Sequence, residues 1–146
     1  MLGVLIAVLS GALMSVQGVF NSGVTKQVSL TLCAAFVQLS AFAVCALSWL
    51  FTRDGESPLA LFRIDSKYML LGGVIGAAIT FAVVKSITAL GPAGAAVITV
   101  TSQVAAAYII ELFGLFGVEK APFEARKLIG IVAAIGGIIL FNWGKK

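Results

Sequence analysis

Long apolar runs separated by short polar stretches dominate the pattern of this chain. Five such runs lie at about residues 2–20, 30–51, 68–90, 92–114 and 127–143. At about 1.5 Å rise per residue, each can cross the roughly 30 Å hydrocarbon core of a bilayer as a helix. The runs are continuous rather than alternating, which argues against membrane strands. The pattern therefore predicts an all-α integral membrane protein with five transmembrane helices in a single domain, residues 1–146.

Two polar stretches and one tight connection separate the later runs. The segments "TRDGESPLALFRIDSK" (52–67) and "VEKAPFEARK" (118–127) each contain one proline and mixed charges, which is typical of a loop or a short interfacial segment. The sequence "LGPAG" (90–94) predicts a tight hairpin, with Pro92 in the first turn of the fourth helix.

The composition agrees with a membrane protein and narrows the chemistry. The chain is 60% hydrophobic and 11% charged, whereas a soluble domain carries about 25% charged residues. Its first run lacks a basic n-region and an A-x-A-like cleavage site, so a retained helix is expected rather than a signal peptide. There is no histidine, and the two cysteines, Cys33 and Cys45, lie about 18 Å apart along one predicted helix. A metal site, a disulfide, a cofactor and an enzymatic centre are therefore not expected.

The basic residues give a weak orientation signal. Six lie on the side of the N-terminus and three on the other side, or four with Lys85: Arg53, Arg63, Lys67, Lys120, Arg126 and Lys127 against Lys26, Lys145 and Lys146. The positive-inside rule favours a cytoplasmic N-terminus, but the margin is modest. We therefore expect the chain to insert both ways, or to need a partner inserted the other way.

Polar side chains inside the apolar runs are the candidate substrate site. In the first run, polar residues recur at helical spacing and share one face with Met14. The amides of the first, second and fourth runs are the candidate substrate-binding residues: Gln17, Asn21, Gln38 and Gln103. Such amides either hold helices together in membrane bundles or line a polar cavity, and both interpretations stay open.

Small residues mark the fifth run as a candidate assembly surface. Gly130 and Ala134 are four residues apart, as are Ala133 and Gly137. This spacing lets two helix backbones approach closely. The run has no polar side chain between Leu128 and Phe141, so it is better suited to a dimer contact than to lining a cavity.

Two charged residues, Lys85 and Glu111, fall inside apolar runs. A charge within a membrane helix suggests a functional site, and a partner for it is expected. Within one chain the two lie on the order of 20 Å apart in depth, whereas in an inverted second copy they would lie level. The sequence therefore predicts a charged pair between antiparallel subunits. The alternative is that both side chains snorkel to the membrane interface.

The same segments carry a resemblance to a known family. The sequences "GALMSVQGVFNSGVTK", "LLGGVIGAA", "LGPAGAAVITVTSQVAAAYIIELFGLFG" and "RKLIGIVAAIGGIIL" resemble the YdcZ-like family of the drug/metabolite transporter superfamily. The resemblance implies a five-helix half-transporter of the bacterial inner membrane that exports small molecules. It also implies that such half-transporters occur in three forms: single proteins that insert in both orientations, pairs of subunits with opposite orientation, or fused chains of ten helices. The related small multidrug resistance proteins carry a glutamate in the first helix, where Gln17 and Asn21 stand here, so their cation/proton antiport mechanism is not carried over.

These observations predict an exporting secondary transporter that works by alternating access in an antiparallel, ten-helix dimer. Its partners are expected to be the lipid bilayer, a neutral polar or anionic solute, and either a second copy or an inverted paralogue, with no role for nucleic acid. A passive channel is the first alternative, although it needs a continuous polar path and only the first and fourth runs offer a polar face. A non-transporting membrane interaction subunit is the second alternative.

Overall fold

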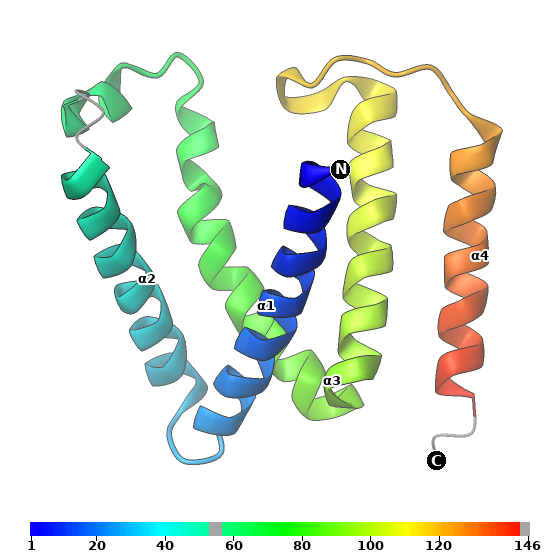
Figure 1. The fold of residues 1–146 in the computed structure, drawn as a ribbon, viewed down its shortest axis with the longest axis horizontal. Coiled ribbons are helices and arrows are strands. Elements are labelled where there is room, and N and C mark those ends of the chain that lie inside the picture. Colours follow the sequence, from blue (N-terminus) through cyan, green and yellow to red (C-terminus); the bar gives the residue numbers. More distant parts are fainter. Residues whose placement is uncertain (53–56, 144–146) are drawn as a thin grey trace. The chain divides into compact units, whose positions relative to one another are not determined.

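The computed structural model describes residues 1–52 and 57–143, and all secondary structure in these ranges is helical. The α-helices are α1 (Leu2–Val24), α2 (Leu30–Thr52), α3 (Gly72–Phe113) and α4 (Ala125–Asn142), and the short 3-10 helices are η1 (Pro58–Arg63), η2 (Lys67–Leu71) and η3 (Leu115–Gly117) (Figure 1). The prediction of an all-α protein is confirmed. Of the basic residues used in the orientation argument, Arg53, Lys145 and Lys146 lie outside the described residues.

The chain divides into two compact units, Met1–Lys85 and Ser86–Lys146. The first contains α1, α2, η1, η2 and the beginning of α3, and the second contains the rest of α3 followed by η3 and α4. The single-domain organisation stays a prediction.

In the first unit, α1 and α2 form a helical hairpin whose contacts lie next to the turn (Figure 1). The backbone N–H of Thr25 closes α1 on the carbonyl of Asn21, and the Ser29 hydroxyl accepts from the backbone N–H of Leu32 at the start of α2. The side chains of Ser22, Cys33 and Ala34 are buried here. Helix α1 continues to Val24 rather than ending near residue 20, because the polar residues after Phe20 still form helical hydrogen bonds.

Helix α3 is interrupted at Gly91, within the segment where the sequence predicts a connection. Gly91 has φ 76° and ψ 163°, a backbone conformation that L-residues rarely adopt. Pro92 follows and has no N–H to donate to a preceding turn. The continuous stretch Lys67–Phe113 is 47 residues long, more than twice the roughly 20 residues that a membrane crossing needs. The break at Gly91 therefore leaves a span-length helical run on each side.

Three helical stretches of the described residues are long and apolar enough to cross a membrane: Leu2–Val24, Leu30–Thr52 and Lys67–Phe113. Counting the last as two runs gives four, and α4 corresponds to the predicted fifth. The count of five membrane spans stays a prediction, because α4 is not among these candidates.

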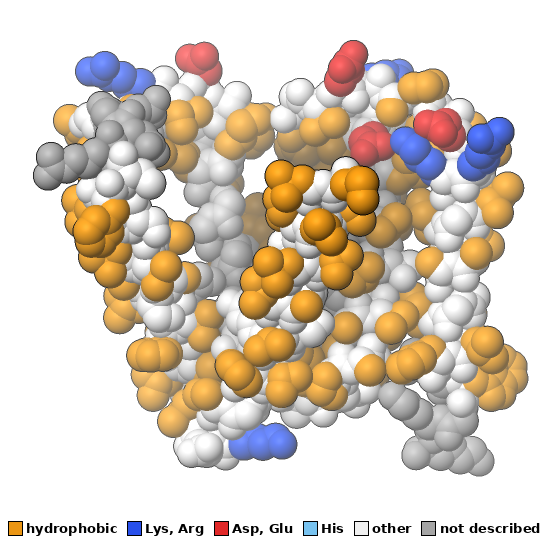
Figure 2. Space-filling model, in the orientation of Figure 1, with side chains coloured by type: hydrophobic (Ala, Val, Ile, Leu, Met, Phe, Trp, Pro, Cys, Tyr) orange, Lys and Arg blue, Asp and Glu red, His pale blue; other side chains and the backbone are white. Residues whose placement is uncertain are grey.

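Hydrophobic side chains cover the outside of both units. Figure 2 shows them over the helices, with Lys, Arg, Asp and Glu side chains gathered at helix ends and in loops. Few apolar side chains are buried among the described residues: Cys33, Ala34, Val84, Ile87, Ala95 and Tyr108. Apolar surface on this scale is unfavourable in water and needs lipid or another protein chain to cover it. The structure therefore agrees with an integral membrane protein.

Candidate functional site

Glu111, the acidic residue inside the fourth apolar run, has a partner within its own unit. Its Oε2 lies 3.2 Å from Nζ of Lys127, in the first turn of α4. The same ammonium lies 3.3 Å from Oε1 of Glu124. Lys127 thus bridges two carboxylates, one on α3 and one just before α4, and the three side chains together carry one net negative charge. Their exposed fractions are between 41% and 48%, so solvent screening weakens both ion pairs.

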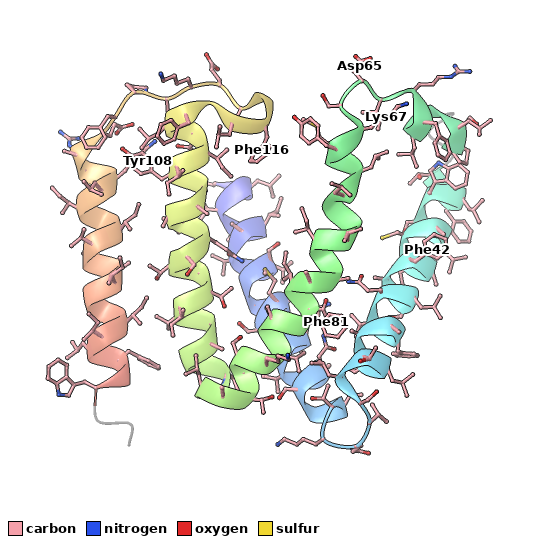
Figure 3. The ribbon with its side chains drawn as sticks, turned by 180° about the vertical axis from the view of Figure 1, so that it is seen from behind. Phe42, Asp65, Lys67, Phe81, Tyr108 and Phe116 are labelled. Atoms are coloured by element: carbon pink, nitrogen blue, oxygen red, sulfur yellow. The ribbon has the colours of Figure 1, made fainter. Side chains whose placement is uncertain are left out.

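Tyr108 holds the beginning of α4 against α3. Its side chain is 6% exposed, and its hydroxyl accepts from the backbone N–H of Glu124 at 2.9 Å and donates to the Glu124 carbonyl at 3.1 Å. Glu124 is the N-cap residue of α4. The Lys127 ammonium lies 5.5 Å from the centre of the Tyr108 ring, within the range of a cation–π contact. Tyr108, labelled on α3 in Figure 3, thus holds the beginning of α4 and covers one side of the Lys127 ammonium.

The loop between α3 and α4 also depends on Glu111 through its backbone. The Glu111 carbonyl accepts from the N–H of Ala121 at 2.9 Å and from that of Gly114 at 3.4 Å. Gly114 ends α3 in the left-handed conformation, with φ 64° and ψ 38°. A Cβ at this position would lie 3.3 Å from the Cβ of Lys120 and from the Val118 carbonyl oxygen. The loop therefore returns tightly toward α3, and this return brings Lys127 near Glu111.

A groove of about 350 Å³ opens beside this ion pair, between α3 and α4. Its lining residues are Val104, Ala107, Tyr108, Glu111, Lys127, Gly130 and Ile131. The walls are apolar apart from one carboxylate, one ammonium and one phenol ring. The carboxylate of Glu111 and the ammonium of Lys127 both line this groove, so the ion pair is accessible from it.

The first unit contains two polar contacts at the predicted amide positions. Nε2 of Gln38, on α2, donates to the Thr80 hydroxyl on α3 at 3.4 Å, and Thr80 donates in turn to the Gly76 carbonyl. Near the hairpin turn, the Cys33 thiol donates to the backbone carbonyl of Asn21 at 3.6 Å, so this contact does not use the Asn21 side chain. Gln38 is half-buried, as is Asn21. These contacts join neighbouring helices, as polar residues in membrane bundles often do.

The remaining predicted site residues are exposed. Gln17 on α1 and Lys85 on α3 belong to the first unit, and Gln103 on α3 belongs to the second. The two ion pairs among the described residues both involve Lys127, and neither includes Lys85. The antiparallel pairing of Lys85 with Glu111 stays a prediction. The predicted packing residues of α4 are also all exposed: Gly130, Ala133, Ala134 and Gly137.

Sequence reasoning placed Lys127 at a loop boundary and did not single out Tyr108 or Glu124. Lys127 and Glu111 are 16 residues apart, and only a tight return of the intervening loop makes them neighbours. One signal was available, because Glu124 and Lys127 have the i, i+3 spacing of a helical ion pair. Among the described residues, no group of three or more His, Cys, Asp or Glu side chains could hold a metal ion.

Residues 2–140 match the model of a protein family described as "Putative inner membrane exporter, YdcZ". The match covers nearly the whole chain, including α1, α2, α3 and most of α4. Neither the curated proteins nor the solved structures gave a match.

Proposed function

Because the chain belongs to the YdcZ family of inner membrane exporters, we propose that it is a subunit of a small-molecule secondary transporter. The family match over residues 2–140 is the observation that carries this proposal. The protein is a multi-pass protein of the inner membrane, with helices long and apolar enough to span it. A small-molecule solute and the lipid bilayer are its partners in this role.

We propose that the working unit is an antiparallel dimer of ten helices, formed with a second copy or with an inverted paralogue. The weak bias of basic residues supports insertion in both orientations. Helix α4 offers a contact surface of small residues that is open in the single chain. A Cβ built at Gly130 or at Gly137 meets no atom within 4 Å. A second helix could therefore approach this backbone closely.

The proposed substrate path is lined by Gln17, Asn21, Gln38 and Gln103. Gln17 and Gln103 are exposed, so their amides are accessible to a solute or a second subunit. Gln38 has only one long hydrogen bond, 3.4 Å to Thr80, and its carbonyl oxygen can still accept. Amides together with a lysine suit a neutral polar or anionic solute. Rocking of the two inverted halves around this site would give alternating access.

Glu111 and Lys85 are the proposed charged residues of the transport cycle. The intrachain partner Lys127 already compensates Glu111 in the single chain. Lys85 of an inverted subunit would lie at the same membrane depth as Glu111. It could replace Lys127 as the partner of Glu111 in one state of the dimer and separate from Glu111 in another. This exchange would couple subunit arrangement to the groove beside α4.

Counterflow in proteoliposomes tests the transporter proposal. Purified protein is reconstituted with a high internal concentration of each unlabelled solute from a panel of neutral polar and anionic compounds, and entry of external labelled solute is followed. A carrier gives saturable uptake that exceeds equilibrium and then decays. Gln38→Leu should lose it, whereas Ser40→Ala, on the same helix and exposed, should retain it. Flux that rises linearly with concentration indicates a pore, and no flux across the panel would contradict a transporter.

A further inference from the structure

An apolar groove of about 710 Å³ lies in the first unit, between the end of α2 and the 3-10 helix η1. One wall is formed by Phe42, Ala46 and Trp49 of α2, which are spaced i, i+4 and i+7 and so share one helix face. The other wall comes from the segment that includes η1: Ser57, Pro58, Ala60, Leu61 and Ile64. None of the proposed transport residues lines this groove.

Local chemistry determines where η1 begins. Pro58 occupies its first turn, where a missing N–H costs nothing. The Ser57 hydroxyl accepts from the Leu59 N–H at 3.3 Å, which caps the helix. Since that hydroxyl is engaged, the groove offers a ligand a nearly uniform hydrocarbon lining. A polar solute would lose its hydration there without gaining hydrogen bonds.

The groove lies where a membrane-spanning helix ends. Trp49 is in the last turn of α2, which is 23 residues long, and tryptophan is enriched where a helix leaves the hydrocarbon core. Arg63, Asp65 and Lys67 are all exposed. Figure 3 shows Phe42 on α2, Asp65 in the loop after η1, and Lys67 at the beginning of η2. Arg63 stands between Leu61 and Ile64, two groove residues. Arg63, Asp65 and Lys67 together carry one net positive charge, and this segment contains Ile64, which lines the hydrocarbon groove.

We propose that this groove binds one acyl chain of an anionic phospholipid, with the phosphate headgroup held by Arg63 and Lys67. The apolar walls from Phe42 to Ile64 suit an acyl chain, and the two exposed basic side chains close to Ile64 in the sequence suit the phosphate headgroup. A guanidinium and an ammonium both donate to phosphate oxygens. Asp65 opposes this attraction and limits it. The bound lipid would contact both η1 and α2 and so stabilise the connection between α2 and α3.

Trp49 provides a direct reporter of the lipid in the groove. The chain has two tryptophans, so Trp143→Phe leaves Trp49 alone to report quenching by lipids with brominated acyl chains. The protein is placed in phosphatidylcholine vesicles with increasing fractions of brominated phosphatidylglycerol, or of brominated phosphatidylcholine. Half-maximal quenching should need about fivefold less of the anionic lipid, the preference expected from one net positive charge near the membrane surface.

Three variants of the single-tryptophan protein sharpen the test. Arg63→Gln with Lys67→Gln should abolish the headgroup preference while leaving quenching by phosphatidylcholine intact, which also shows that the protein is inserted. Asp65→Asn should increase the preference. Ala46→Leu, which fills the groove, should reduce the preference for the anionic lipid although Arg63 and Lys67 are unchanged. Trp49→Phe leaves the exposed Trp143 as the reporter. Since Lys145 and Lys146 follow Trp143 in the sequence, the control result is that quenching of Trp143 does not change when Arg63 and Lys67 are replaced.

Equal quenching curves for the two lipids would mean ordinary boundary lipid and would overturn the proposal. A preference that survives removal of both basic side chains would overturn the assignment of the headgroup site. If neither lipid quenches Trp49 while Trp143 is quenched normally, protein covers the groove, and the occupant is a second chain rather than a lipid.

Discussion

Lys127 Nζ lies 3.2 Å from Glu111 Oε2 and 5.5 Å from the ring centre of Tyr108, so one side chain of α4 is held by two residues of α3. Glu111 and Tyr108 are three residues apart and lie on the same helix face. Because the ion pair is more than 40% exposed on both sides, it contributes little stability by itself. The ion pair instead determines where charge lies, because it places the cluster of Glu111, Glu124 and Lys127 beside the groove between α3 and α4.

Tyr108→Phe should loosen the start of α4. The change removes a hydroxyl that both accepts from and donates to the backbone of Glu124, at a cost of about 1–2 kcal/mol. We expect a lower melting temperature in detergent and faster amide hydrogen exchange at residues 124–128. Phe123→Leu changes an exposed ring in the loop before α4 without removing a hydroxyl and is the control. Equal effects of the two changes would contradict the capping role of Tyr108.

Gly114→Ala should destabilise the loop that connects α3 to α4. At φ 64° an alanine is strained by about 1–2 kcal/mol, and its Cβ would also press against Lys120 and Val118 at 3.3 Å. Gly136→Ala, in an open helical position of α4, should instead be neutral or slightly stabilising. Thermal unfolding of the two variants in one detergent measures the difference. A Gly114→Ala protein as stable as the parent would show that the loop does not need this return.

The sequence pattern predicted the helices well because lipid imposes a simple requirement on length and polarity. Runs of about 20 apolar residues and the break at Gly91 follow from local rules that hold without knowledge of packing. The partner of Glu111 could not be derived in that way. It depends on a left-handed Gly114, on the hydrogen bonds of Tyr108 to Glu124, and on a helix that begins at Ala125 rather than at residue 127. Together these move Lys127 from a loop into the first turn of α4.

The small-residue surface of α4 should matter for assembly. Gly137→Leu puts bulk where a second helix would approach, and we expect the dimer to become a monomer in detergent while the protein still inserts. Val132→Phe adds the same number of carbon atoms to an exposed residue on another face of α4 and should leave the dimer intact. Size-exclusion chromatography with light scattering measures the outcome. An unchanged dimer in Gly137→Leu would move the contact to another helix, with the glycines of α3 as the next candidates.

Both membrane orientations should be present in cells that make only this chain. Cys33 and Cys45 are replaced by alanine, and a single cysteine is introduced at position 145, which lies outside the described residues. Labelling with an impermeant maleimide from outside should modify a substantial fraction of the copies, and permeabilisation should expose the rest. Labelling of every copy from one side, in a functional protein without a partner, would exclude an antiparallel homodimer.

Two double-mutant cycles should decide which lysine compensates Glu111. In the first cycle, Glu111→Gln is combined with Lys127→Met, and the effects on the melting temperature of monomeric protein are compared. Because these side chains are paired within one unit, the melting temperature of the double variant should fall by less than the sum of the two single decreases.

In the second cycle, Glu111→Gln is combined with Lys85→Met, and dimer dissociation is measured. Partial recovery in the double variant would indicate that Lys85 of an inverted subunit reaches Glu111, since removing one member leaves a lone charge in the membrane. If the losses in this second cycle simply add while those in the first do not, Glu111 belongs to Lys127 alone and the intersubunit pair is wrong. A transport rate that titrates with pH in the parent and not in Glu111→Gln would then assign the carboxylate to proton exchange at the groove of α3 and α4.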